Sequence, residues 1–312
     1  MRNSSLLRIY GKLIISAGCW GGAFVAAKIV VQQLPPTLAA ALRFTLAFSV
    51  LLVALIIKEG KKAWVPPRDW ALLIAAALTG IALYNIFFFT GMIYTSPING
   101  SLIVSSGPVM TTLISGLLFK ERITGRQSLG LFLSLGGVAV IISQGSWSIL
   151  KELAFNKGDL IIAGALFCWS LYTVIGKATG QRWSSLLATT YACGLGAVIL
   201  WIFAWPHVHT TQWQNLEPPV IVAVIFMAVF ASAIAFVFWY DGVRQVGAGR
   251  TSAFQNLVPV FSAVSANLIL GDRIFPFHAI GAVLILYGVY LANSKQKPQP
   301  VQTLACSPKN AP

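Results

Sequence analysis

Residues 99–109 read Asn-Gly-Ser-Leu-Ile-Val-Ser-Ser-Gly-Pro-Val, and residues 250–260 read Arg-Thr-Ser-Ala-Phe-Gln-Asn-Leu-Val-Pro-Val. Each segment is followed by an apolar run and then by a short charged segment. A constant offset pairs Ser101 with Ser252, Pro108 with Pro259, Glu121 with Asp272, and Arg122 with Arg273. A Pro within a membrane helix frees a backbone carbonyl, which is tolerated only where protein or a water-filled cavity satisfies it. We therefore expect both segments to be cavity-lining helices of two related halves.

The composition indicates an all-α integral membrane protein. The chain has 312 residues, of which 57% are hydrophobic and 10% are charged, and its mean hydropathy is +0.77. Soluble domains carry roughly 25% charged residues. The apolar runs are long enough to cross a bilayer, which takes about 20 residues each. We expect about ten helices: one ending near Val31, then Thr37–Ile57, Trp70–Thr90, Ser96–Phe119, Ser128–Ser143, Asp159–Lys177, Leu186–Trp205, Val220–Tyr240, Thr251–Leu270 and Phe277–Asn293.

The basic residues predict the orientation. The net charge is +14, which in a soluble protein would suggest nucleic-acid binding. Here Lys and Arg lie mainly at the ends of the spans. With the N-terminus inside, 17 of the 22 lie in inside segments, three in outside segments, and Lys28 and Arg43 within spans. Inside loops of membrane proteins are enriched in Lys and Arg. We therefore expect a multi-pass protein of the cell (inner or plasma) membrane with both termini cytoplasmic, and no nucleic-acid partner.

The duplication extends to the start of each half. Cys19-Trp20 is followed by Lys28, and Cys168-Trp169 is followed by Lys177 at the same spacing, so Cys19-Trp20 belongs to a repeat rather than to a cleaved leader. Because five spans per half is an odd number, the second half enters the membrane with opposite orientation. Such inverted-topology repeats are common in secondary transporters, which bind substrate near the midplane between the halves. The expected divisions are a cytoplasmic lead (1–12), the first repeat (13–143), an external linker (144–158), the second repeat (159–293) and a disordered cytoplasmic tail (294–312).

With these motifs the chain resembles the EamA family of the drug/metabolite transporter superfamily, whose members carry two EamA repeats. The residues that carry the resemblance are Trp20 to Lys28, Arg43-Phe44, Pro108-Val109 to Glu121-Arg122, Trp169 to Lys177, and Pro259-Val260 to Asp272-Arg273, and it extends from about Leu13 to Asn293. The resemblance implies ten helices, a central cavity built by the first, third and fourth helices of each half, and alternating access. The implied function is a secondary active transporter, with export of a small metabolite such as an amino acid.

Helical spacing groups the candidate cavity residues by face. We expect the substrate cavity to be lined by Trp20, Lys28, Asn85, Ser105, Trp169, Tyr172, Trp239, Gln255 and Asn256. Structural roles are expected for Arg43, Pro108, Glu121, Pro259 and Asp272. The alternatives stay open, because small polar residues also occur where membrane helices only pack closely, and aromatic stripes also face lipid.

Two cations within the spans carry an expectation about the substrate. Charges inside a membrane are costly and are usually functional or paired. Lys28 either faces the cavity or extends its ammonium to the outer interface. Arg43 either faces the cavity or ties helices together through backbone carbonyls. No Asp or Glu lies in mid-span. We therefore expect a substrate with a carboxylate, most simply a zwitterionic amino acid, rather than a cationic drug.

Enzyme signals are weak. His207 and His209 lie in an outer loop and His278 at a helix start, with no nucleophile or carboxylate at a catalytic spacing, no Cys/His cluster with metal-ligand spacing, and no phosphate-binding P-loop. We expect no enzyme activity, cofactor or metal, and the lipid bilayer and a small molecule as partners. A multidrug exporter of lipophilic compounds, an integral membrane enzyme and a channel are the alternatives. Antiport of a proton or of a second substrate is compatible with the sequence, which leaves the oligomeric state open.

Overall fold

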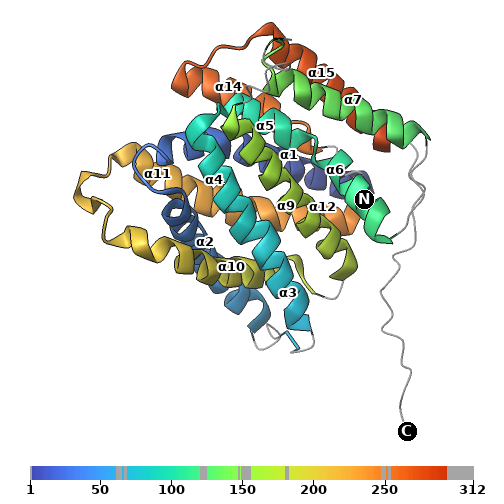
Figure 1. Ribbon diagram of the computed structural model, residues 1–312. Coiled ribbons are helices and arrows are strands. Elements are labelled where there is room, and N and C mark those ends of the chain that lie inside the picture. Colours follow the sequence, from blue (N-terminus) through green and yellow to red (C-terminus); the bar gives the residue numbers. More distant parts are fainter. Residues whose placement is uncertain are drawn as a thin grey trace.

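The computed structural model describes residues 2–60, 65–66, 69–119, 125–146, 148, 156–179, 183–246, 251 and 254–293, and in this part every regular element is helical (Figure 1). The expectations for Glu121, Ser252 and the tail from 294 lie outside the described residues, as does that for the side chain of Lys177. The first half comprises α1 (Arg2–Val30), α2 (Pro36–Glu59), α3 (Trp70–Ala76), the π-helical η3 (Ala77–Leu83), α4 (Tyr84–Tyr94), α5 (Pro97–Ser105), α6 (Gly107–Phe119) and α7 (Gly125–Ile142). The second half comprises α9 (Lys157–Thr179), α10 (Ser185–Val208), the 3₁₀ turn η4 (Trp213–Asn215), α11 (Pro218–Phe226), the π-helical η5 (Met227–Ile234), α12 (Ala235–Val246), α14 (Val258–Leu270) and α15 (Pro276–Asn293).

The long helices have the length and composition of membrane spans. Six stretches are long and apolar enough to cross a bilayer: Leu6–Val30, Pro36–Glu59, Trp70–Tyr94, Lys157–Ile175, Ser185–Val208 and Pro218–Gly242. Shorter apolar helices cover Ser128–Ile142, Val258–Leu270 and Pro276–Leu291. The third and eighth spans combine α3, η3 and α4 in one half and α11, η5 and α12 in the other. The six long stretches, the three shorter helices and the α5–α6 segment together account for the ten predicted spans.

Local sequence signals set several helix boundaries. Ser96 caps α5, because its hydroxyl accepts a hydrogen bond from the backbone N–H of Asn99, and Pro97 occupies the first helical position. Ser184 caps α10 in the same way through Leu187. At the end of α14, Gly271 has φ of 70°, a left-handed conformation that glycine adopts without steric cost. These signals fix where α5 and α10 begin and where α14 ends.

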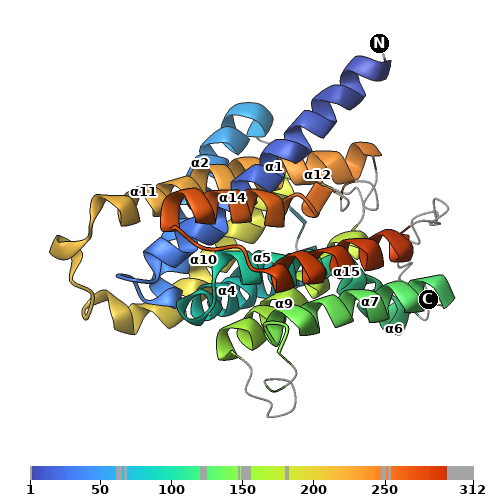
Figure 2. The same cartoon turned by 90° about the horizontal axis from the view of Figure 1, so that it is seen from above.

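The two halves interlock rather than forming separate bodies. Helix α1 of the first half packs against α11, α12 and α14 of the second, and α9 of the second half packs against α3, α4, α5 and α6 of the first. Helix α2 packs along α10, and α7 lies beside α15 (Figures 1 and 2). The contacts of α1 with α11, α12 and α14 are the repeat counterparts of those of α9 with α3, α4 and α6, so both halves contribute to the core of the molecule.

The α7–α15 pair is held at close range by glycines. A Cβ on Gly137 would lie 2.7 Å from the carbonyl oxygen of Gly281, and a Cβ on Gly288 would lie 2.6 Å from that of Gly130. No real Cβ contact is that short, so the backbones can approach this closely only without side chains. The repeat offset relates Gly130 to Gly281 and Gly137 to Gly288. The contact is therefore symmetric between the halves.

Irregular helical turns recur at matched positions in the two halves. The π-helical η3 and η5 overlap when the first half is shifted by the repeat offset, and both lie in the middle of the third span of their half. The fourth span is interrupted at Ser106, whose N–H bonds to Ile103, and the ninth is interrupted at Leu257, whose N–H bonds to Phe254. Both breaks precede the prolines of the repeated motif. The predicted continuous helix Ser96–Phe119 is thus divided into α5 and α6.

Candidate functional site

A small cavity lies between the two halves, next to the helix breaks. Its lining comes from the first, third and fourth helices of both halves and from α2: Trp20, Ala23, Phe24, Arg43, Tyr84, Phe88, Ser101, Val104, Ser105, Trp169, Phe236, Gln255 and Val258. Four of the residues predicted to line the cavity are among them, namely Trp20, Ser105, Trp169 and Gln255. The described lining is therefore mainly apolar, with six aromatic side chains, a few hydroxyl and amide groups and one cation.

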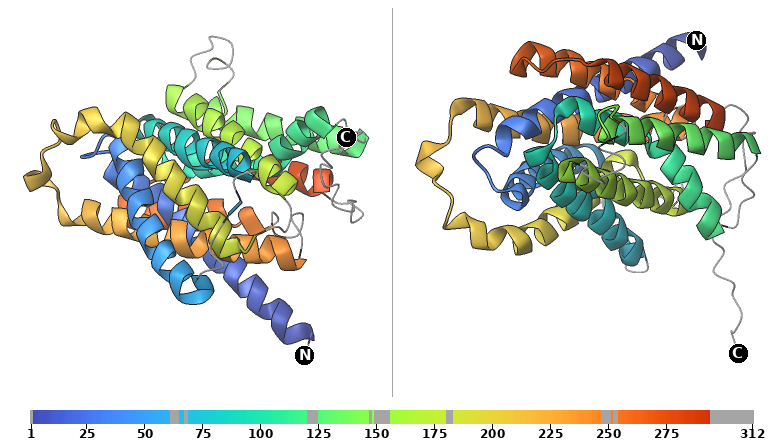
Figure 3. Two further views of the ribbon diagram at one scale, coloured as in Figure 1. Left: turned by 90° about the horizontal axis from the view of Figure 1, so that it is seen from below. Right: turned by 45° about the horizontal axis from the view of Figure 1, so that its top comes forward.

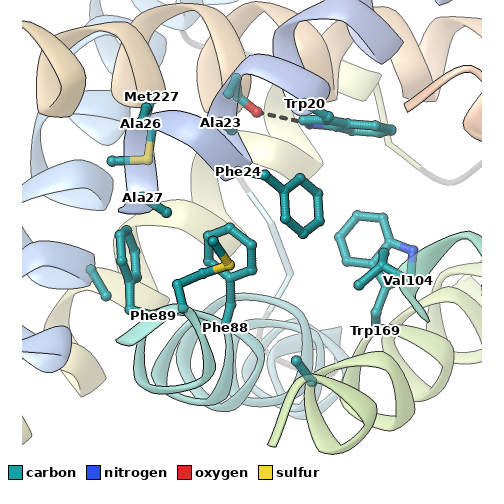
Figure 4. Packing of buried hydrophobic residues seen from close by; sticks show 14 of the residues in the cluster. Trp20, Ala23, Phe24, Ala26, Ala27, Phe88, Phe89, Val104, Trp169 and Met227 are labelled. Carbon is teal, nitrogen blue, oxygen red and sulfur yellow. Dashed lines mark hydrogen bonds between the residues drawn. The ribbon is translucent and has the colours of Figure 1, made fainter. Parts of the chain in front are cut away.

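The aromatic wall is built around the repeated tryptophans. The rings of Trp20 and Trp169 meet edge to face with their centroids 6.0 Å apart. The indole N–H of Trp20 donates to the carbonyl oxygen of Ala231 at 2.9 Å, which fixes that ring against η5. Phe24 packs edge-on against Phe88 at 5.1 Å. Figure 4 shows these four rings, two from α1 and one each from α4 and α9, reaching toward the same interior space.

The polar side of the cavity lies at the two helix breaks. The side chains of Ser101 and Ser105 are buried, and each hydroxyl donates to a carbonyl three residues earlier, that of Ile98 at 2.9 Å and that of Leu102 at 2.7 Å. These bonds occupy the hydroxyl protons and leave the oxygen lone pairs as acceptors. Gln255, which is 6% exposed, adds an amide from the segment before α14.

Arg43 is the single charged residue in the described lining. It is 4% exposed on α2 and reaches the third span of each half. Its Nε donates to Ser232 Oγ at 2.8 Å, and its Nη1 donates to Asn85 Oδ1 at 3.2 Å. Asn85 is fixed in turn by its Nδ2, which donates to the carbonyl oxygen of Ile81 at 2.8 Å. No carboxylate pairs with Arg43 among the described residues.

Lys28 lies outside the cavity lining. Its Nζ donates to the carbonyl oxygens of Met92 at 2.9 Å, Ile93 at 3.2 Å and Thr95 at 2.8 Å. The last four carbonyls of an α-helix have no partner within the helix, and the helix dipole favours a cation there. Lys28 therefore stabilises the C-terminal end of α4.

Four other residues predicted for the cavity are not part of its described lining. Asn85 is 1% exposed and contacts Arg43 rather than the cavity. Trp239 packs against Trp20 with ring centroids 5.0 Å apart, and Tyr172 packs against Trp169 at 5.3 Å and hydrogen-bonds to the hydroxyl of Tyr240. Asn256 is half-buried outside the lining.

Among the residues given structural roles, Pro108 and Pro259 follow the helix breaks, and Asp272 lies just beyond α14. Arg43 is the exception, since it lines the cavity as well as bridging helices. The lining also includes Phe24 and Phe236. Helical spacing places Phe24 on the face of Trp20 and Phe236 on the face of Trp239, so the sequence offers both as weaker candidates for the cavity.

A second polar cluster joins the halves beyond the cavity. The carboxylate of Asp159, in the first turn of α9, is fully buried and accepts from the Thr95 hydroxyl and from Asn99 Nδ2 at 3.4 Å. Asn99 Oδ1 lies 2.8 Å from His278 Nε2, while His278 Nδ1 accepts from the Phe275 N–H at 3.0 Å. This arrangement assigns the proton of a neutral His278 to Nε2. The sequence places Asp159 and His278 only at helix ends, and nothing in their local sequence indicates the cluster.

Comparison with known proteins identifies the repeat. The profile of the EamA-like transporter family matches residues 8–143 and again 156–294. A Bacillus subtilis (strain 168) protein named uncharacterized transporter YyaM is 36% identical over 287 residues, which cover 92% of this chain and 94% of that protein. An uncharacterized transporter of Archaeoglobus fulgidus is 30% identical over 277 residues, covering 89% and 94%.

A solved crystal structure shares the fold. Its chain superposes with a TM-score of 0.62 at 22% sequence identity, and the match covers 93% of this chain and 96% of that chain. The two matched repeats and the helical architecture agree with the predicted ten-helix, 5+5 inverted-topology fold.

Proposed function

Because this chain belongs to the EamA-like transporter family, we propose that it is a secondary active transporter that exports a small metabolite, such as an amino acid, by alternating access. The observation that carries the proposal is the position of the cavity. It lies between the two repeats, beside helix breaks that recur in both, and discontinuous helices at a repeat interface form the substrate sites of many secondary transporters.

We assign the substrate contacts to the residues of the cavity wall. Trp20 and Trp169 hold the apolar part of the substrate, and Ser105 and Gln255 offer hydrogen-bonding groups to its polar part. Tyr172 and Trp239 act from behind the wall by holding the two tryptophans in place, and Asn85 by orienting Arg43. This assignment is supported by the lining of the cavity and by the ring contacts around it.

The proposed orientation places both termini in the cytoplasm and the protein in the cell membrane. The distribution of Lys and Arg supports it. The start of α1 and the connection between α10 and α11 project from opposite ends of the bundle (Figures 2 and 3), as expected for an inside N-terminus and an outside loop. The repeats are proposed to run from 13 to 143 and from 159 to 293, joined by the external linker.

A multidrug exporter of lipophilic compounds is the second candidate, because six aromatic side chains line the cavity. The buried guanidinium of Arg43 favours the first candidate, since it repels lipophilic cations. An integral membrane enzyme has less support, because His278 binds Asn99 and a backbone N–H rather than a nucleophile.

Transport into proteoliposomes tests the proposal. The purified protein is reconstituted and offered a panel of labelled metabolites, with and without a pH gradient, beside protein-free vesicles. We expect protein-dependent uptake or counterflow of at least one metabolite. A bulky residue at the cavity, as in Ser105→Trp, is expected to stop it, whereas Leu268→Trp on the exposed face of α14 is the matched control. Equal loss in both variants, or no protein-dependent flux, would reject the proposal.

A further inference from the structure

We propose that Arg43 binds the carboxylate of the transported substrate and that this substrate is a monocarboxylate with an aromatic or branched apolar body. The inference rests on the proposed transport function and narrows its substrate class. It assigns recognition to the carboxylate and not to an ammonium group.

The guanidinium of Arg43, a residue of the cavity lining, has N–H donors that no described residue accepts. An arginine carries five N–H donors in a planar fork. Ser232 and Asn85 accept two of them, and the other three have no hydrogen-bond partner among the described residues. Both acceptors are neutral, so they orient the guanidinium without neutralising it. A carboxylate accepts two parallel N–H bonds from such a fork, and its single negative charge cancels that of the guanidinium.

Arg43 gives the described cavity lining one positive charge, and this charge comes from the first half alone. The offset between the halves is 149 residues at Trp20 and 151 at Pro108, which puts the counterpart of Arg43 within Ala192–Gly194, a segment without charge. The second in-span cation, Lys28, is engaged by the three carbonyls at the end of α4. One available cation matches one carboxylate, and a dianion or phosphate would remain uncompensated.

The rest of the lining matches an apolar body. Phe24, Tyr84 and Phe88 continue the wall begun by the two tryptophans, with Tyr84 and Phe88 stacked at 5.8 Å. The described lining holds no carboxylate that could pair with an ammonium group. An amino group would therefore meet only hydroxyl oxygens, an amide and ring faces, so it is tolerated without being required.

Three probes that share one phenyl body separate these chemistries: 3-phenylpropionate, L-phenylalanine and phenethylamine. Binding to the purified full-length protein is measured by ligand-induced thermal stabilisation, and transport by counterflow in proteoliposomes. We expect 3-phenylpropionate to bind at least as tightly as L-phenylalanine, and phenethylamine not to compete. Stronger binding of phenethylamine, or no stabilisation by any of the carboxylates at millimolar concentration, would overturn the proposal.

Variants locate the site. Arg43→Gln retains an amide that can bond to Ser232 and is expected to weaken 3-phenylpropionate binding by more than about tenfold, since charge-assisted hydrogen bonds are lost. Arg43→Lys, which keeps the charge, should recover part of the affinity. Lys28→Met removes the other in-span cation and should leave the ligand ranking unchanged. Unaltered binding in Arg43→Gln would refute the assignment, and if that variant does not fold, the ligand ranking and Arg43→Lys still decide.

The experiments distinguish failure of the Arg43 site from failure of the proposed transport function. Transport of other metabolites with phenethylamine preferred over 3-phenylpropionate would reject the Arg43 site and leave the transporter assignment intact. Binding of 3-phenylpropionate that depends on Arg43, without flux of any solute, would support the site and reject the transport function.

Discussion

Replacing Lys28 by Met separates the two roles that the sequence allows for this residue. In the structure its ammonium contacts three carbonyl oxygens, those of Met92, Ile93 and Thr95, at 2.8 to 3.2 Å. Met keeps most of the length of the aliphatic stem but removes the donors and the charge. If Lys28 stabilises the end of α4, the change lowers stability and leaves substrate recognition intact.

The magnitude follows from these three contacts. Hydrogen bonds between membrane helices contribute about 0.6 kcal/mol on average and up to about 1.7 kcal/mol each. Three of them give about 2 kcal/mol, and a cation at a helix C-terminus adds roughly 0.3–1 kcal/mol. We expect Lys28→Met to lower the free energy of unfolding by about 2–3 kcal/mol, and Lys28→Arg to cost less because it keeps the charge.

Thermal unfolding of the detergent-solubilised protein, followed by tryptophan fluorescence and by gel filtration of heated samples, measures this loss. The matched control is Lys157→Met, because the ammonium of Lys157 lies 4.3 Å from the centre of the Tyr94 ring, near the same end of α4. An exposed cation–π contact contributes about 0.5–1 kcal/mol, so the control should shift the transition less. Unchanged stability in Lys28→Met together with lost substrate binding would make Lys28 a substrate residue and refute our interpretation.

Three further predictions concern orientation, the cavity and the glycine contact. Single Cys probes at Ser148 and Gln212 in a Cys-free background should be labelled from outside intact cells by a membrane-impermeant reagent, and labelling only after lysis would reverse the topology. Ser105→Leu should reduce transport at least about tenfold at normal membrane levels, because it fills the polar side of the cavity; unchanged transport would mean that this face only packs helices. Gly137→Val should destabilise the protein by about 1–3 kcal/mol or more, as overpacking does. A Cβ on the neighbouring Gly136 would meet nothing within 4 Å, so Gly136→Val should be tolerated, and equal thermal stability of the two variants would contradict the close α7–α15 contact.

The sequence predicted the fold well because a bilayer leaves few choices. Every spanning segment must satisfy its own backbone, so the apolar runs translate directly into helices. The interruption at Ser106 was not predicted, because a Pro alone does not state how many residues before it the helix ends. The π-helical η3 and η5 were also missed, since their Ala-rich sequences carry no local signal for a wider turn.

The candidate site was predicted only in part, for a geometric reason. Residue spacing groups side chains by helix face but does not fix the rotation of that face toward the cavity. Trp20 and Trp169 reach the lining, whereas Trp239, on an equally plausible face, stands one layer behind. The places of Lys28 and Arg43 depend on which acceptors lie within reach, and those acceptors come from spans distant in the chain.

The structural elements that occur in both halves and Arg43, which occurs in one half only, are suited to different roles. In an inverted repeat, inward-facing and outward-facing states arise when the halves exchange conformations, so the elements that move must be present in both. The helix breaks, the π-helical turns and the close glycine contacts between α7 and α15 meet this requirement. A ligand with one charged end has no such symmetry, and a single residue suffices to bind that end. Arg43 has no charged counterpart, yet it bonds to Asn85 in the third span of one half and Ser232 in the third span of the other. Under the proposed transport function, a carboxylate that draws the guanidinium toward the cavity would weaken both bonds together, so substrate binding would act on the third span of each half at once.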